Sequence, residues 1–316
     1  MSGRSKREDV ERDGARDSNR QARGGSLVAR LLRSTRGRVL LIVGVLAIVG
    51  VVVVGRMVWL HVREHVAARD DYRLTAADIS ITSPPPWIHA NVKAEAIHNG
   101  LTGAPLSILD DGLVERIHSV FSLHPWVAKV QRVTKSHPAH VEVEIVYRRP
   151  VAMVEVPGGW YPVDAEGVLL PIDDFSPADA RSYPLLSGVE SSPIGGAGVK
   201  WGDAIVAGGA QIAESLGPLW SEFALRKIRW AKPAAGSDPA APALFELLTA
   251  GGNVILWGAA PGTETSGEPT AQQKIVRLKA YVASHGSLDD PRGGPRDLDL
   301  RRADAGARTA ARPMSP

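Results

Sequence analysis

The chain has 316 residues and no cysteine, and its formal net charge is +3. Without thiols it can have neither disulfides, nor a cysteine nucleophile, nor a Cys-based zinc or iron–sulfur centre. The positive charge lies in residues 1–38, which hold eleven basic and five acidic side chains, so the rest of the chain is net acidic. This distribution argues against a nucleic-acid-binding body. It predicts a basic, disordered tail at the N-terminus.

An apolar segment follows the tail and predicts a transmembrane helix over residues 39–60. Residues 39–55 contain no polar side chain, and after Arg56 the apolar character continues to Leu60. A helix of this length extends about 33 Å, which matches the roughly 30 Å hydrocarbon core of a bilayer. The run is long for a signal peptide, and no small-x-small cleavage site follows it. We therefore expect a permanent anchor.

The charges that flank this helix predict its orientation. Four arginines precede it with no acidic residue among them, namely Arg30, Arg33, Arg36 and Arg38. The basic residues that follow it are mixed with acids such as Glu64. Because the more positive flank stays in the cytoplasm, we expect a cytoplasmic N-terminus, a juxtamembrane linker at residues 61–75 and an extracytoplasmic remainder.

Residues 76–149 show a pattern of strand, two helices and two strands. The expected elements are a strand at 77–83, helices at 91–100 and after about 110, and strands at 126–135 and 140–148. Gly100 is expected just beyond the end of the first helix, and Asp110 or Asp111 as the cap of the second. The last two strands alternate apolar and polar side chains, which predicts a sheet with one buried face.

Residues 150–302 predict a β-rich domain with two helices, which makes the whole chain an α+β protein. The expected strands are 151–156, 159–164, 167–172, 225–231, 244–250, 253–258 and 297–301, and the helices are 203–217 and 271–284. Turn-forming sequences such as Pro-Gly-Gly separate the first strands. The final strand is expected at an edge of the sheet, followed by a disordered tail at residues 303–316.

Arg148, Arg149 and Pro150 stand where one predicted domain ends and the next begins. Proline fixes φ and has no N–H, so Pro150 prevents the preceding strand from extending its ladder. For the two arginines we consider two roles: they keep the junction solvated, or they contact a partner.

A metal site is the main catalytic alternative. His61, Glu64 and His65 match the H-x-x-E-H pattern of inverted zinc peptidases, in which two histidines one turn apart bind zinc and the glutamate activates water. The motif directly follows the apolar segment, however, where a juxtamembrane helix rich in histidine and arginine is expected at the lipid headgroups. A membrane-anchored extracytoplasmic zinc peptidase is therefore the alternative function.

Two further groups carry weaker catalytic hypotheses. His137 and His140 flank a turn and form a second possible metal pair, and Asp173 with Asp174 forms a carboxylate pair of the kind used in glycan cleavage. Both groups lie in turn sequences, where polar residues usually serve the backbone. Asp164 and Glu166, in the turn "VDAEG", are interpreted in the same way.

Several motifs, in their order along the chain, resemble the extracytoplasmic part of FtsQ/DivIB-type bacterial cell-division proteins. The motifs are "GLTGAPLSILD" at 100–110, "PWV" at 125–127, "RRPVA" at 148–152, "VDAEGV" at 163–168 and "DLDLR" at 297–301. The resemblance covers roughly residues 75–302. The basic tail and single apolar segment are also similar to the layout of that family.

The resemblance implies a POTRA domain at 76–149, a β domain at 150–302 and a non-enzymatic scaffold at the division septum of the inner (plasma) membrane. It implies partner binding at the closing strand by β-strand addition, through Leu298, Asp299, Leu300, Arg301 and Arg302. The implied partners are bitopic FtsB- and FtsL-like proteins and possibly an FtsK-like protein. No cofactor, nucleic acid or small-molecule substrate is implied. A sensor that signals through the cytoplasmic tail is a third hypothesis.

Overall fold

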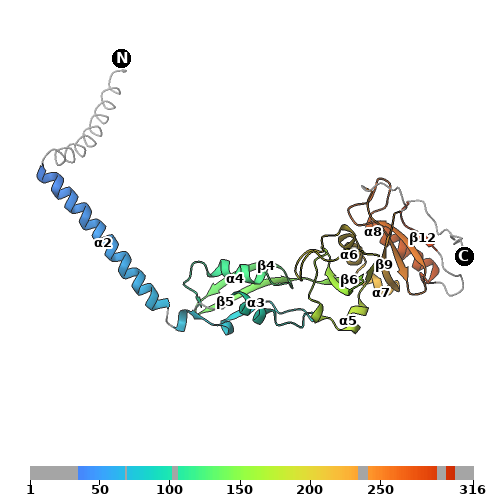
Figure 1. Ribbon diagram of the computed structural model, residues 1–316, viewed down its shortest axis with the longest axis horizontal. Helices are drawn as coiled ribbons and strands as arrows, with labels where there is room; N and C mark the ends of the chain where they lie inside the picture. The colour runs from blue at the N-terminus through green and yellow to red at the C-terminus, as the bar shows by residue number, and fades with distance from the viewer. Residues whose placement is uncertain (1–34, 68–69, 102–105, 234–240, 290–296, 303–316) are drawn as a thin grey trace, which may run out of the picture. The chain divides into compact units, whose positions relative to one another are not determined.

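The computed structural model describes residues 35–67, 70–101, 106–233, 241–289 and 297–302 (Figure 1). The chain divides between Tyr72 and Arg73 into two compact units. The predicted tail at residues 303–316 and most of the predicted tail at 1–38 lie outside the described residues.

The first unit contains one long helix, α2 (Thr35–Ala67). Within it, Val39–His61 is long and apolar enough to cross a membrane, in agreement with the span predicted at 39–60. Its apolar side chains are exposed, as for Val51 at 73%. An apolar helix without protein contacts is suited to lipid, because its backbone is fully hydrogen-bonded internally. The short 3₁₀ turn η1 (Asp70–Tyr72) ends this unit.

The second unit begins with a three-stranded sheet in the order β2 (Ile79–Ile81), β5 (His140–Tyr147) and β4 (Val127–Ser136). Strand β2 is parallel to β5, and β4 is antiparallel to it. Helices α3 (Val92–Gly100) and α4 (Leu113–Ser122) fall between β2 and β4 in the chain, so the predicted β-α-α-β-β order is confirmed. The apolar stripe of α4 is fully buried at Leu113, Ile117 and Phe121.

Both predicted caps in this region are wrong in detail. Gly100 is the last residue of α3 and does not lie beyond it. A Cβ at this position would lie 2.4 Å from Cγ2 of Val120, so the glycine permits α3 and α4 to pack closely. The N-cap of α4 is Gly112, whose N–H donates to Asp110 Oδ1 at 3.0 Å. Asp110 therefore holds the turn that precedes the helix.

The remainder of the second unit is built on a seven-stranded sheet in the order β12-β11-β10-β9-β8-β6-β7. Its strands are β6 (Pro150–Val156), β7 (Gly159–Asp164), β8 (Leu185–Ser187), β9 (Leu225–Ala231), β10 (Leu244–Thr249), β11 (Val254–Ala259) and β12 (Asp297–Asp299). Strands β6, β8 and β9 are mutually parallel, as are β11 and β12, and the other neighbours are antiparallel.

Helices α6 (Ala204–Leu216) and α8 (Ala271–His285) bury their apolar sides in the core of this sheet. Both helices are labelled in Figure 1. A Cβ at Gly209 would lie 2.6 Å from Leu186, so this glycine lets α6 approach the sheet closely. Both helices were predicted, but β8, α5 (Pro177–Ser182) and α7 (Leu219–Glu222) were not.

The strand predicted at 167–172 is wrong. That segment makes only two isolated bridges, Val163 to Leu169 and Val168 to Lys200. A further pairing was also missed, since β1 (Arg73–Leu74) and β3 (Leu106–Ser107) form a small antiparallel sheet.

Candidate partner-binding site at a sheet edge

The strand β12 forms one end of the seven-stranded sheet. It pairs with β11 from Asp297 to Asp299, and the Leu300 N–H continues the pairing by donating to the Leu256 carbonyl at 3.0 Å. Among the described residues, no strand lies on its other side. An edge strand of this kind presents unpaired N–H and C=O groups to solvent.

The side chains of this strand are divided between core and solvent. Leu298 and Leu300 are buried, with 9% and 2% exposure, whereas Arg301 and Arg302 are exposed. Because the Leu300 N–H faces β11, alternation turns the backbone groups of Asp299 and Arg301 to the open side. Leu298 and Leu300 were predicted as partner-binding residues, but their side chains already belong to the core of this chain.

One open-side backbone group is already occupied. The Asp299 carboxylate accepts the Arg301 N–H at 2.9 Å and two guanidinium N–H groups of the same residue at 3.0 and 2.8 Å. The hydrogen bonds from the Arg301 side chain lower the pKa of Asp299 below its usual value, and the same contacts raise the pKa of Arg301. Asp299 therefore caps the edge two residues beyond its own position, at the Arg301 N–H.

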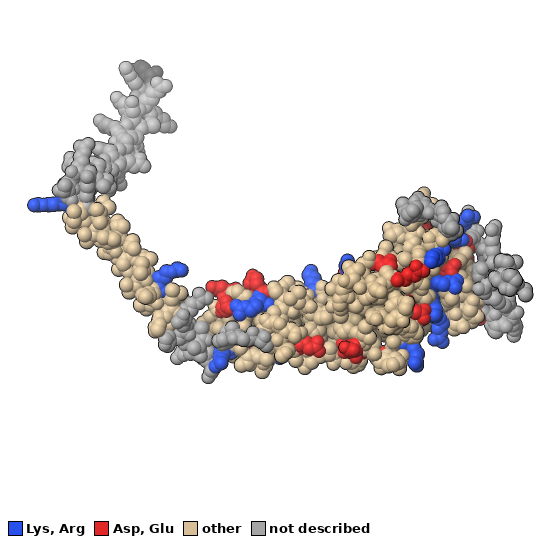
Figure 2. All heavy atoms as spheres, in the orientation of Figure 1, with Lys and Arg blue, Asp and Glu red and all other residues tan. Residues whose placement is uncertain are grey.

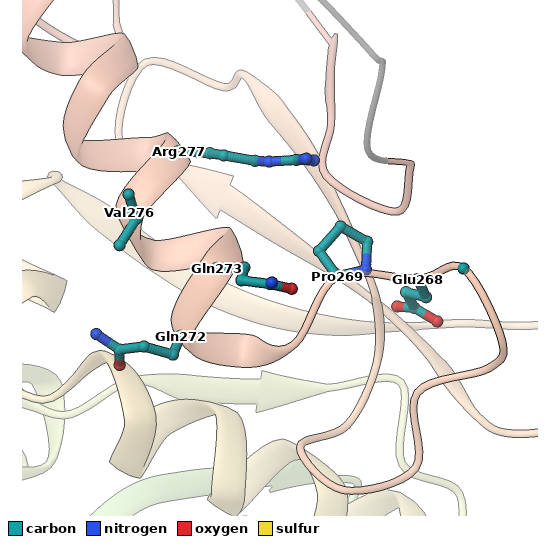
Figure 3. A pocket seen from close by; sticks show the side chains of 7 residues that line it. Glu268, Pro269, Gln272, Gln273, Val276 and Arg277 are labelled. Carbon is teal, nitrogen blue, oxygen red and sulfur yellow. The ribbon is translucent and has the colours of Figure 1, made fainter.

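A pocket lies beside this edge (Figure 3). It has a volume of about 430 Å³, and its lining is Gly267, Glu268, Pro269, Gln272, Gln273, Val276 and Arg277. Arg277 donates to the carbonyl of Arg302 at 2.6 Å, which ties α8 to the chain that follows β12. Val276 is 57% exposed and supplies an apolar surface. Figure 2 shows acidic and basic side chains mixed on the surface at this end of the molecule. Ion pairs of the sheet include Arg229 with Glu246 and Arg301 with Asp299.

A buried ion pair fixes the loop that carries the pocket. Lys274 Nζ lies 2.6 Å from Glu268 Oε1, and the two side chains are 0% and 6% exposed. The same Glu268 oxygen accepts the Ala259 N–H at 2.8 Å. Lys274 also lies 5.2 Å from the ring centre of Trp257. Since either charge left alone in the interior would be costly, the pair holds loop and helix to the end of β11.

The predicted junction residues lie between β5 and β6. The Arg148 N–H donates to the Trp126 carbonyl at 2.9 Å, so the pairing of β5 extends one residue beyond Tyr147. Strand β6 then begins at Pro150. The Arg148 guanidinium is 2.7 Å from Asp164, and both side chains are largely buried, at 14% and 8% exposure. Arg149, 55% exposed, pairs with Glu214. Arg148 therefore takes neither of the two roles that we expected, because it forms an internal ion pair.

Asp174, in the 3₁₀ turn η3 (Ile172–Asp174), contacts Trp126, the residue that directly precedes β4 of the three-stranded sheet. Its carboxylate accepts the Trp126 indole N–H, and its carbonyl accepts the His89 Nδ1–H at 3.0 Å. The Phe175 ring lies 6.1 Å from the Trp126 ring, and the Trp87 indole donates to the Arg148 carbonyl at 3.1 Å. The hypothesis of a carboxylate pair overlooked this structural role.

The buried His124 supports the same contact. Its Nδ1 accepts the N–H of Trp126 at 3.2 Å, and its Nε2 lies 3.2 Å from Glu95. Burial lowers the pKa of His124, which favours the neutral ring that this acceptor role needs.

Within the described ranges there is no group of three or more potential metal ligands. Glu64 and His65 lie in α2, but their side chains are not among those that the structure describes. His140 Nε2 lies 3.2 Å from Ser80 Oγ. Asp164 accepts the N–H groups of Glu166 and Val168 at 2.9 Å each, as expected of a turn residue.

Comparison with known proteins adds one finding to this geometry. Part of the chain is similar to a cell-division protein. It is 37% identical over 67 residues to "Cell division protein FtsQ" of Anaeromyxobacter sp. (strain K). The match spans 21% of this chain and 21% of the relative. No protein-family model matches the chain. The local match and the apolar helix support the resemblance seen in the sequence.

Proposed function

We propose that this protein is a non-enzymatic, membrane-anchored scaffold of bacterial cell division that binds partner proteins by β-strand addition at β12. The open side of this strand carries the proposal. Its leucines are already buried, so the strand offers a partner mainly backbone groups. In strand addition, main-chain hydrogen bonds give affinity and neighbouring pockets give specificity. The pocket beside α8 could receive a side chain of the added strand, because its lining residue Arg277 bonds to the Arg302 carbonyl just beyond β12.

The local similarity to a cell-division protein gives the biological setting. In this proposal α2 anchors the protein in the inner membrane, with the N-terminus in the cytoplasm and both sheets outside, at the division septum. The three-stranded sheet with α3 and α4 is a POTRA domain, and the seven-stranded sheet is the partner-binding β domain. The partners are FtsB- and FtsL-like membrane proteins, with an FtsK-like protein as a further candidate.

The experiment that tests this function is Asp299→Pro, with Asp299→Ala as the matched control. Proline removes the N–H of residue 299 on the open side but leaves the bonds of Leu298 and Leu300 to β11. We expect Asp299→Pro to weaken co-purification with FtsB- and FtsL-like partners at least tenfold, about 1.4 kcal/mol. Asp299→Ala, which keeps the N–H, should bind.

Circular dichroism and urea denaturation verify that both variants fold. Leu300→Pro is less informative, because it would remove an internal bond and a buried side chain. A folded Asp299→Pro variant that binds its partners as tightly as the wild type would contradict strand addition at β12.

A further inference from the structure

The opposite end of the seven-stranded sheet, β7, is covered along only part of its length. Residues 168–170 lie beside it, with the Leu170 N–H donating to the Pro162 carbonyl at 2.9 Å and the Asp164 N–H to the Val168 carbonyl at 3.1 Å. The chain then leaves the strand through Pro171 and enters η3. Because backbone groups alternate along a strand, the N–H and C=O of Trp160 face the same side as the Pro162 carbonyl. They lie beyond the point at which the covering segment ends.

The surface is hollowed at this point. A pocket of about 310 Å³, which we call the β7 groove, is lined by Met153, Trp160, Pro162, Ile172, Phe175 and Arg181, among others. Trp160 is 38% exposed and Ile172 is 43% exposed. Large apolar side chains that are exposed to solvent beside a concavity are typical of binding sites.

One lining residue adds a charge. Arg181, in α5, is exposed, and within the described part of the chain no carboxylate lies at ion-pair distance from it. Two acidic residues of this region bond elsewhere, Asp174 to Trp126 and Asp179 to Ser176, and Asp173 is exposed to solvent. A guanidinium without a carboxylate partner favours a ligand that carries one.

From these three features we propose that the β7 groove binds an extended, acidic segment of another polypeptide. The segment pairs with the backbone of Trp160, where residues 168–170 stop, and inserts a bulky apolar side chain between Trp160 and Ile172. An aspartate or glutamate of the segment meets Arg181. This would be a second strand-addition site, at the opposite end of the sheet from β12 and independent of it.

The test uses the full chain in lipid nanodiscs and a displayed library of random twelve-residue peptides. We expect the enriched peptides to contain a large apolar residue flanked by aspartate or glutamate. Their Kd, measured by fluorescence anisotropy, should rise at least tenfold on Trp160→Ala. It should not change on Ile194→Ser, a control that alters an exposed apolar side chain (76%) outside the groove.

One further protein variant and two changed peptides test the charge contact and the backbone pairing separately. Arg181→Glu should weaken binding about fivefold, and replacing the peptide's acid by lysine should restore it. N-methylation of the peptide at the residue opposite Trp160 should abolish binding if the backbone pairs. Binding that survives Trp160→Ala, or the absence of any enriched peptide, would overturn the proposal. So would binding lost on Asp299→Pro, since the peptides would then use β12. Self-association abolished by Trp160→Ala would assign the groove to a second copy of this chain instead.

Discussion

At the scale of single residues, Asp299 is the residue that most directly controls access to the proposed binding strand β12. Its carboxylate accepts both the N–H and the guanidinium of Arg301, so a partner that pairs beyond residue 299 must displace it. Edge strands commonly carry such devices against unspecific pairing. Asp299 thereby leaves the edge of β12 open to a partner strand but favours a partner that can displace the hydrogen bonds of Arg301.

The lowered pKa of Asp299 gives a pH prediction. A carboxyl group whose pKa is lower in the folded state stabilises that state above its unfolded pKa, about 3.9, and this contribution is lost as the pH falls through the folded pKa. We expect the NMR shift of the Arg301 N–H to titrate with a midpoint below about 3.9, the ordinary pKa of an aspartate, and Asp299→Asn to abolish the titration. A midpoint at or above that value would show that Asp299 does not hold Arg301.

At the scale of elements, Gly100 shows how one residue decides the packing of two helices. A Cβ there would lie 2.4 Å from Val120 Cγ2, and the β-branched Val120 has few rotamers with which to move away. We expect Gly100→Ala to cost about 1–3 kcal/mol of unfolding free energy in urea denaturation.

The matched control is Gly112→Ala, since the nearest atom to a Cβ there is Asp110 Oδ1 at 3.7 Å. Its effect should be at most about 1 kcal/mol, the cost of placing alanine in place of glycine at an N-cap. Val120→Ala should recover most of the loss in a double variant with Gly100→Ala. Equal stability of the two glycine variants would refute the close contact.

The same scale shows what sequence patterns can predict. Strands with clear alternation, such as β5, and helices with an apolar stripe, such as α4, were predicted because local spacing determines them. The segment 167–172 is as apolar as a strand, but it turns away at Pro171. Strand β8 has only three residues, and its parallel neighbours are distant in the chain, so no local pattern marks it.

For the candidate site, the sequence predicted that the last strand, β12, lies at an edge of the sheet, but it did not predict the contacts of the side chains. The last strand of a sheet-rich domain is commonly an edge, which the sequence predicted for β12. The burial of Leu298 and Leu300 depends on the register with β11. Trp126 and Asp174 meet across 48 residues of sequence, a contact that no spacing rule indicates.

At the scale of the whole second unit, the bond from Trp126 to Asp174 links the segment before β4 to the turn η3 that follows β7, and so connects the two sheet regions. The chain has no native cysteine, so spin labels can be placed at exposed Gln131 and Arg226, one on each sheet. We expect double electron–electron resonance to give a narrow distribution of the distance between the two labels. This distribution should broaden in Asp174→Ala, which loses the bond to Trp126. Asp173→Ala, its exposed neighbour, is the control and should leave the distribution narrow. Equal widths in both variants would show that Asp174 does not join the sheets.

The most direct measurement is amide hydrogen exchange at Asp299, in the free protein and in a complex with the proposed FtsB- and FtsL-like partners. Asp299 presents its N–H on the open side of β12, so an added strand must protect it. We predict at least tenfold slower exchange at Asp299 in the complex and unchanged exchange at Leu300, whose N–H already bonds to Leu256. A stable complex in which the Asp299 N–H exchanges as fast as in the free protein would contradict the account.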